Sequence, residues 1–385
     1  MSIKDLLNQG KLRQVSLMNL KDNTKGAEKF VELFQGRLKK LVGTNNLPPG
    51  MAIAILANLN FHGQNMPASV FRRLDYDQGW ETSEDPIILA EALKRIKDKK
   101  VVIDRTKRIK IGEFQLQYNF VRGFRPKRGA KRFDIPLDLP FDPNKFNYGF
   151  KAVDPELFHS VKYDNSLTVD FVFNRYPFAP YHFLWVPNRK KRGHNQYLDT
   201  DKDEYLIEAA WDFVREQGLG KGIRLCYNSN GAHASVNHLH FQGFFLTQDW
   251  EPPFETIIRE YRANKAKTDN LSGTIDYYFK GTRWISGSDG VDGLKEFIDE
   301  MNRRYASGEK VAFNLCIAPE GIACFPRKHQ GDEKYFELLQ RSPFTTGYAF
   351  FEMLGEIISP TADVSIFDKN RTERQIRDLY NALSL

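Results

Sequence analysis

A polar segment covering residues 228–242 constrains this chain more than any other stretch of its 385 residues. The segment reads Asn228-Ser-Asn-Gly-Ala-His-Ala-Ser-Val-Asn-His-Leu-His-Phe-Gln242. Its first half is rich in Asn, Gly and Ser, which favour turns and can direct backbone N–H groups toward an anion. We therefore expect a loop in which Asn228, Asn230, Gly231 and Ser235 hold a phosphate group.

The second half of this segment alternates polar and apolar residues. On a strand, side chains two apart point to the same face. His238, His240 and Gln242 would therefore share one face, while Leu239 and Phe241 would anchor the strand from the other. A row of imidazole and amide groups beside an anion-binding loop indicates phosphate chemistry.

The composition indicates an ordinary globular protein of the cytoplasm. Hydrophobic residues make up 41% of the chain, and no run approaches the ~18 apolar residues that a membrane-spanning helix needs. The first residues lack the apolar region of a signal peptide. The three cysteines, Cys226, Cys316 and Cys324, lie in apolar, strand-like stretches without a Cys-x-x-Cys pair. This argues against a disulfide framework and a four-ligand zinc site, and no membrane partner is expected.

The charge balance favours an acidic ligand. Lys and Arg exceed Asp and Glu by 56 to 49, which gives a net charge of +7. This mild excess suits a nucleotide, whereas a nucleic-acid surface would require a concentrated basic patch, so no nucleic-acid partner is expected. The densest positive stretch, residues 122–132, carries six basic residues in eleven. It is either a solvated loop or a clamp for a phosphate or nucleotide.

Hydrophobic periodicity predicts an α+β fold with mainly antiparallel sheets and flanking helices. Helical periodicity occurs in residues 1–45, 87–96, 203–217, 291–305, 336–340 and 372–383. Strands are predicted for residues 51–59, 114–119, 167–173, 182–187, 223–227, 272–279, 311–317 and 322–326. The fourth strand should return antiparallel to the third as a long hairpin. No low-complexity linker divides the chain, so its parts should pack as one body.

The pattern His238-x-His240-x-Gln242 is compatible with three roles. A neutral imidazole can attack phosphorus and hold a nucleotidyl group, and a free histidine, with a pKa of about 6.5, is already mostly neutral near pH 7. Two histidines on a strand can also bind zinc, but a catalytic zinc site needs a third good ligand and Gln is a poor one. The pattern can finally be structural. The polar loop and the basic stretch favour the first role, with no metal or other cofactor.

Several spaced motifs resemble one protein family. They are Gln117-Tyr-Asn119-x-x-Arg122, Pro140-Phe-Asp-Pro-x-Lys-Phe-Asn147, Asn174-x-x-Pro177-x4-His182-x-Leu-x-Val-Pro187, Ser235-Val-Asn-His238-Leu-His240-Phe-Gln242, and Phe313-Asn-Leu with Phe325-Pro-Arg-Lys328. Together they are similar to the His-x-His-x-Gln nucleotidyltransferase and phosphorylase branch of the histidine-triad superfamily. Within that branch they most resemble the GDP-L-galactose and GDP-D-glucose phosphorylases, as a divergent member.

The resemblance implies a mechanism and a set of partners. His240 would be the nucleophile that accepts a nucleoside monophosphate, with His238 and Gln242 beside it. Asn119 and Arg122 would lie near the nucleotide, and Asn174 and His182 near the phosphate. The expected substrates are a GDP-hexose or related nucleotide and inorganic phosphate, and a homodimer is possible. Two other functions stay open, namely a diadenosine tetraphosphate-type phosphorylase or hydrolase, and a non-catalytic nucleotide-binding protein.

We expect the chain to divide into three regions. Residues 1–105 match nothing in the family and have no assigned role. Residues 106–250 would form a catalytic histidine-triad-like unit, and residues 251–385 a degenerate second copy with C-terminal helices. The chain departs from the family pattern at three places: after Asn119, where an acidic, Gly-containing stretch is usual; at His233, which replaces a large apolar residue; and at Tyr181, which replaces a Gly.

Overall fold

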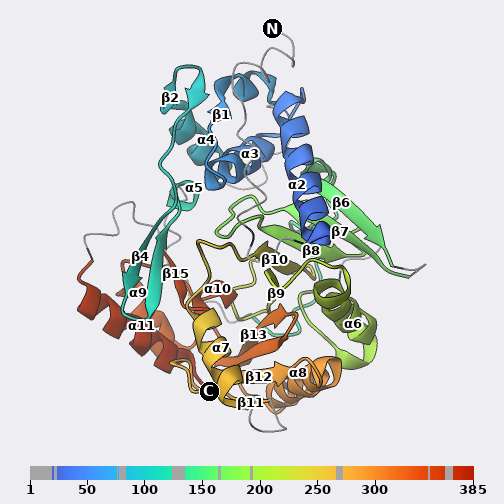
Figure 1. Ribbon diagram of the computed structural model, residues 1–385, viewed down its shortest axis with the longest axis vertical. Helices are drawn as coiled ribbons and strands as arrows, with labels where there is room; N and C mark the ends of the chain where they lie inside the picture. Colours follow the sequence, from blue (N-terminus) through green and yellow to red (C-terminus); the bar gives the residue numbers. More distant parts are fainter. Residues whose placement is uncertain are drawn as a thin grey trace.

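A nine-stranded antiparallel sheet forms the centre of the molecule in the computed structural model (Figure 1). The structure describes residues 20, 24–75, 77, 84–123, 135–163, 166–190, 194–265, 272–345, 347–359 and 367–385. Most of the basic stretch 122–132 and the first part of the predicted N-terminal helical region therefore lie outside the described residues. The predicted α+β class, with antiparallel sheets and helices around them, is confirmed.

The strands of the central sheet follow the order β11-β12-β14-β13-β9-β10-β8-β7-β6, and each neighbouring pair is antiparallel. Their bounds are β6 Leu157–Lys162, β7 Thr168–Phe173, β8 Phe183–Pro187, β9 Ile223–Asn228, β10 Phe241–Phe245, β11 Gly273–Thr274, β12 Arg283–Ser286, β13 Val311–Ala318 and β14 Gly321–Lys328. The predicted hairpin is present as β7 and β8.

The two halves of this sheet have the same topology. In the first half, β7, β8, helix α6 (Thr200–Glu216), β9 and β10 follow one another, and the strands lie in the order β7-β8-β10-β9. In the second half, β11, β12, helix α8 (Gly290–Ala306), β13 and β14 give the order β11-β12-β14-β13. The halves join through β9 and β13, where Cys226 lies opposite Cys316. A duplicated unit would produce this arrangement.

Helices cover both faces of the central sheet. On one face, Phe213 of α6 packs against Phe171 and Phe183, and Phe297 of α8 packs against Phe313. The opposite face is covered by α7 (Phe254–Lys265) and the short helix α10 (Phe350–Met353). There Phe244 packs against two phenylalanines of α10, and a buried Arg224–Glu255 ion pair joins β9 to α7.

The remaining elements form two groups beside the central sheet. The N-terminal helices lie at the top of Figure 1, and β4, β15, α9 and α11 lie together at one side. The bounds are α2 Lys25–Gly43, α3 Pro49–Phe61, α4 Asp85–Leu93, α5 Phe120–Gly123, α9 Glu333–Gln340, α11 Lys369–Leu383, β1 Met66–Pro67, β2 Ile96–Lys97, β3 Lys100–Val101, β4 Lys107–Ile111, β5 Phe114–Tyr118 and β15 Glu356–Ser359, with 3-10 helices η2 Ala68–Arg73 and η3 Lys151–Glu156. β15 pairs parallel with β5, which ties the C-terminal region to the start of the predicted catalytic unit. No helix among the described residues is long and apolar enough to span a membrane.

The predicted strand at residues 51–59 is wrong, because these residues form helix α3. Every residue from Pro49 to Asn60 is buried, so the helix has no polar face and its sequence shows no helical period. Pro49 also lies at the start of this helix, where its missing N–H costs nothing. The Pro-Pro-Gly run at residues 48–50 therefore begins this helix.

Several elements differ from expectation in the C-terminal third. The strand predicted for residues 272–279 is limited to the two residues of β11. Beyond it the chain is irregular, but Ile275, Tyr277 and Phe279 are still buried. The alternation of apolar residues there therefore reflects packing rather than strand pairing. Helix α7 and the short strands β12 and β15 were not predicted. Each strand has only four residues, too few to show a period.

Candidate active site

The loop between β9 and β10 carries both candidate histidines. β10 begins only at Phe241, so His238 and His240 immediately precede the strand that was predicted to contain them. The backbone here pairs with other partners: Leu239 N donates to His194 O at 2.7 Å, and His240 N donates to Gln196 Oε1 at 2.9 Å. Leu239 and Phe241 are buried in the main core, as expected.

His240 is held in one tautomer. Its Nδ1 lies 2.8 Å from the backbone oxygen of His238, and a carbonyl oxygen can only accept a hydrogen bond. The neutral ring therefore carries its proton on Nδ1 and keeps the lone pair on Nε2. Burial lowers the pKa of His240 to about 4, so the ring is neutral at pH 7. The ring of Tyr148 packs beside it, with centroids 5.0 Å apart.

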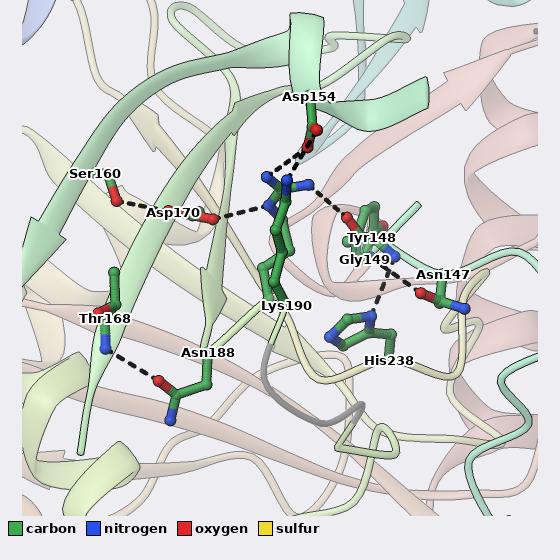
Figure 2. A network of polar contacts seen from close by, with 11 residues as sticks. Asn147, Tyr148, Gly149, Asp154, Ser160, Thr168, Asp170, Asn188, Lys190 and His238 are labelled. Atoms are coloured by element: carbon green, nitrogen blue, oxygen red, sulfur yellow. Dashed lines mark hydrogen bonds and ion pairs between the residues drawn. The ribbon is translucent and has the colours of Figure 1, made fainter. Parts of the chain in front are cut away.

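His238 has the opposite tautomer. Its Nδ1 lies 3.1 Å from the backbone nitrogen of Tyr148 (Figure 2). A backbone N–H can only donate, so the proton of the neutral ring is on Nε2. This Nε2 atom is buried and has no hydrogen-bond partner in the structure. Burial, together with the nearby His240 ring, lowers the pKa of His238 to about 3. The two histidines thus offer one lone pair and one N–H donor.

A buried arginine fixes the segment that orients His238. Arg189 Nη1 donates to the backbone oxygen of Tyr148 at 2.8 Å, and its other nitrogens bind Asp170 and Asp154 at 2.8 and 2.9 Å. Lys190 adds a second contact to Asp154, as Figure 2 shows. Because both carboxylates converge on one buried guanidinium, the Tyr148 backbone is held rigidly against His238.

Gln242 contacts His182 and Asn174 from the neighbouring hairpin. His182 Nδ1 lies 3.4 Å from the backbone nitrogen of Phe178, so its proton is on Nε2, which lies 3.1 Å from Gln242 Oε1. Asn174 Nδ2 approaches the same oxygen at 3.4 Å. With its oxygen engaged by two donors, the amide nitrogen of Gln242 remains as a donor for a ligand. Burial lowers the pKa of His182 to about 3, so it stays neutral.

Asn119 and Arg122 lie against the same hairpin. The side-chain amide of Asn119 donates to Pro177 O, and its oxygen accepts from Arg122 N at 3.3 Å. The Arg122 guanidinium lies over the ring of Phe178, at 5.3 Å from its centroid, and its charge contributes to the lowered pKa of His182. The structure thus brings Asn119, Arg122, Asn174, His182 and Gln242 into one connected group.

Of the residues predicted to hold a phosphate, Asn228 and Asn230 have side chains that bind other protein groups, whereas Ser235 is exposed. Asn228 Oδ1 accepts from Asn314 Nδ2 at 2.6 Å and from Phe350 N at 2.8 Å, so its side chain joins the two halves of the sheet. Asn230 Nδ2 donates to Leu137 O at 3.2 Å and shapes the loop. Ser235 is exposed on the loop surface. The side chains of Asn228 and Asn230 are thus engaged within the protein.

Gly231 has a backbone conformation that suits glycine, with φ of 76°. Its backbone oxygen accepts from Gln330 N at 2.7 Å, and a Cβ here would lie 2.2 Å from His329 Cδ2. Residues that follow β14 therefore set the position of the loop that precedes His240. His233, also at positive φ, lies in the same region, with its backbone nitrogen 2.7 Å from Gln330 Oε1.

Sequence reasoning missed two residues of the site. Gln196 Nε2 donates to both Asn228 O and His240 O, at 2.9 and 3.0 Å, so one amide joins both ends of the loop. Tyr148 orients His238 through its backbone nitrogen and packs on His240. Tyr148 lies one residue beyond the motif that ends at Asn147, and the sequence around Gln196 carries no motif. Among the described residues, no group of three or more His, Cys, Asp or Glu side chains could hold a metal ion.

Comparison with known proteins agrees with the family that the motifs indicated. The family model described as GDPGP1-like, N-terminal domain, matches residues 101–244, which include both histidines and Gln242. Residues 101–244 are a GDPGP1-like N-terminal domain. The predicted resemblance to the GDP-hexose phosphorylases is thereby confirmed.

Two curated relatives are similar to this chain at low identity. It is 24% identical over 308 residues to GDP-L-galactose phosphorylase 2 of Arabidopsis thaliana, which covers 70% of this chain and 66% of the relative. It is 28% identical over 135 residues to GDP-D-glucose phosphorylase 1 of Danio rerio, which covers 34% of this chain and 35% of the relative. The matches therefore span just under two thirds and about one third of these relatives.

Solved structures of yeast Ap4A phosphorylase Apa2 also match the chain. One covers 79% of this chain and 95% of that protein, with a TM-score of 0.46 and 13% identity. Another is the same protein in complex with Ap4A, with a TM-score of 0.44 and 14% identity.

Proposed function

We propose that this protein is a nucleotidyltransferase that phosphorolyses a GDP-hexose to GDP and hexose 1-phosphate through a covalent guanylyl group on His240. The observation that carries the proposal is the 2.8 Å contact between His240 Nδ1 and the His238 backbone oxygen. This contact places the ring proton on Nδ1 and leaves the lone pair on Nε2. The pKa of His240, lowered to about 4, keeps Nε2 unprotonated at pH 7.

The reaction has two displacements at one phosphorus atom. In the first, His240 Nε2 attacks the α-phosphorus, a P–N bond forms, and the bond to the bridging oxygen breaks to release hexose 1-phosphate. In the second, an oxygen of inorganic phosphate attacks the same phosphorus, the P–N bond breaks, and GDP leaves. The N–H of His238 and the amide of Gln242 donate to the non-bridging oxygens, where negative charge develops.

The substrate assignment is supported by the GDPGP1-like domain and by the names of the two curated relatives. The acceptor assignment is supported by Gln242, which occupies the position where hydrolytic members of the superfamily carry a third histidine. An amide stabilises the phosphorus centre but cannot act as a base for water, which favours a phosphate anion as acceptor. Neither step requires a metal or a cofactor.

We further propose that the chain contains two pseudo-repeated units, near residues 106–250 and 251–385, of which only the first is catalytic. Gln242 lies opposite Cys226, and Ala323 lies opposite Cys316, at matching places in the two halves. Counting back from Ala323 places Gly321 and Pro319 at the positions of His240 and His238. The second unit therefore lacks a nucleophile and serves as a scaffold.

The test is a phosphorolysis assay with purified protein and GDP-glucose, GDP-galactose, GDP-mannose or diadenosine tetraphosphate, with and without inorganic phosphate. Release of GDP from a GDP-hexose only when phosphate is present supports the proposal. Turnover of diadenosine tetraphosphate alone would assign the same site to a dinucleoside polyphosphate. Tight nucleotide binding without turnover of any compound would contradict an enzymatic role.

A further inference from the structure

The N-terminal helices contact the hairpin loop that carries two residues of the site. This loop, residues 174–182, joins β7 to β8 and presents Asn174 and His182 to Gln242. The helices α2, α3 and α4 precede residue 101, where the GDPGP1-like match begins. The contacts between them and the loop give a role to a region that the family resemblance leaves unexplained.

The first contact fixes the start of the loop. Asn58, buried within α3, donates from Nδ2 to the backbone oxygen of Asn174 at 3.0 Å. The same nitrogen donates to Ala54 O at 2.8 Å, which orients the amide within its own helix. An element outside the matched domain thus holds the backbone of a residue that contacts Gln242.

The second contact fixes the end of the loop. Tyr181 has φ of 52°, a left-handed conformation that is uncommon for a bulky residue and that Gly adopts without strain. Its ring stacks on His62, which follows α3, with centroids 4.4 Å apart and an interplanar angle of 29°. It also packs edge-on against Phe34 of α2, at 5.7 Å. In the family a Gly precedes the histidine; here an aromatic residue is held there by N-terminal partners.

The third contact fixes the residue after Asn174. Arg175 Nη2 lies 2.6 Å from Glu156, and Nη1 lies 3.5 Å from Asp85 at the start of α4. Tyr176 Oη donates to the same Asp85 at 3.3 Å. These groups are largely buried, so the ion pairs are weakly screened by solvent. All three contacts converge on the two ends of one short loop.

We propose that the N-terminal helical region is a positioning element for this reaction, and that Asn58 and His62 act by holding Asn174 and His182 against Gln242. The inference rests on the proposed function of the site. A displacement of the hairpin loop would release the oxygen of Gln242 and leave its amide free to rotate away from the phosphorus. Misplacement of a catalytic group by about 1 Å can slow a reaction ~100-fold.

The experiment compares Asn58→Ala and His62→Ala with a matched control, Asn60→Ala. Asn60 lies on the same helix and is equally buried, but its amide donates to Ile103 O at 3.3 Å within the N-terminal region. The readouts are the rate of guanylyl-histidine formation from saturating GDP-glucose, the urea midpoint of unfolding, and the 15N signals of His182, assigned by their loss in His182→Asn.

Asn58→Ala and His62→Ala should slow guanylyl transfer about 10-fold and shift the His182 nitrogen signals, with substrate Kd within about 2-fold of wild type. Asn60→Ala should lower the urea midpoint similarly but leave both the rate and the His182 signals unchanged. His62→Phe, which keeps a ring on Tyr181, should restore most of the rate.

Equal effects of all three alanine substitutions on the rate, or unmoved His182 signals in Asn58→Ala, would overturn the positioning role. The NMR readout does not depend on turnover. If the wild-type protein transfers no nucleotide, the proposed function fails, while movement of the His182 signals in Asn58→Ala but not in Asn60→Ala would still support the contact between the N-terminal region and the site.

Discussion

The Nδ1 atom of His240 lies 2.8 Å from the backbone oxygen of His238, two residues earlier in the chain. This contact places the lone pair of His240 on Nε2. In His238, Nδ1 accepts from the Tyr148 backbone N–H, so the Nε2 atom of His238 carries the proton. In the proposed reaction, His240 would attack phosphorus and His238 would donate to its oxygens. The pair requires no change of protonation before the first step.

The role of His238 as a donor can be separated from its role in packing. His238→Asn keeps an acceptor near Nδ1 for the Tyr148 N–H but removes the donor at Nε2, and guanylyl transfer should slow by about 100-fold because one stabilising hydrogen bond to the transition state is lost. His238→Gln retains an N–H near the Nε2 position and should lose much less. Single-turnover kinetics measure both. Equal loss in the two variants would show that packing, not donation, is the function of His238.

Gln196 should matter for stability as well as for activity. It exchanges two hydrogen bonds with His240 and donates a third to Asn228 O, all buried. Gln196→Met keeps the volume but leaves three buried backbone groups without a partner, so we expect a loss of about 2–4 kcal/mol in the free energy of unfolding. Urea denaturation measures this loss. A loss below about 1 kcal/mol would mean that water replaces the amide.

Gly231→Ala should destabilise the loop through two effects. Alanine is strained at φ of 76°, and its Cβ would lie 2.2 Å from the ring of His329. Gly308 provides the control, since its φ is 94° and nothing lies within 4 Å of a Cβ there. We expect a cost of about 1 kcal/mol for Gly308→Ala from backbone strain alone, and at least about 2 kcal/mol for Gly231→Ala. Similar unfolding midpoints for the two variants would remove the argument that His329 confines the loop.

The protein should lose stability as the pH falls from 7 to 5. Burial lowers the pKa of five histidines to about 3 or 4, namely His62, His182, His233, His238 and His240. The unfolded chain takes up protons near pH 6.5 and the folded chain does not, so the unfolded state is favoured at lower pH. Each histidine should remove about 2 kcal/mol of stability at pH 5.

Among the described residues, burial raises the pKa of three carboxyl groups, those of Asp203, Glu352 and Glu356, and these groups oppose this trend. Burial raises the pKa of Glu352 to about 7 in the folded protein. At pH values between the pKa of the unfolded side chain and this value, the folded state binds a proton that the unfolded state does not. The contribution of Glu352 to stability therefore rises as the pH falls through this range. The five histidines outnumber these three carboxyl groups. Urea midpoints at pH 7 and pH 5 should therefore differ strongly, and less so in His62→Phe, which takes up one proton fewer on unfolding. Equal midpoints at the two pH values in the wild-type protein would contradict the buried neutral histidines.

Local sequence patterns predicted the elements that show an apolar stripe or a short apolar run bounded by turn residues. Helix α6 and hairpin β7–β8 were predicted because α6 has one apolar stripe, and because the apolar runs of the two strands are joined by a turn rich in Pro. Helix α3 was taken as a strand because its burial on all sides leaves no period in the sequence. The two histidines were placed within a strand because alternation does not reveal that a side chain, Gln196, replaces the neighbouring strand as their hydrogen-bond partner.

The candidate site residues that were predicted are those that belong to a short sequence motif. His238, His240 and Gln242 are named by one short motif, and His182 and Asn174 by another. Tyr148 and Gln196 act at a separation of 90 and 44 residues from the histidines they contact, so only the folded chain brings them there. For Asn228 and Asn230 the composition of the loop predicted turn residues, but their side chains bind protein groups.

The central claim is that Nε2 of His240 carries the nucleotidyl group, and peptide mapping by mass spectrometry tests it most directly. Wild-type protein, His240→Ala and Gln242→Ala would each be incubated with GDP-glucose in phosphate-free buffer, digested at alkaline pH, and mapped. We predict an acid-labile addition of one GMP group on the peptide containing His240 in the wild-type protein, a slower one in Gln242→Ala, and none in His240→Ala. Addition of phosphate should remove the label as GDP. A label that persists in His240→Ala, or GDP release from wild-type protein without any labelled intermediate, would contradict the assignment.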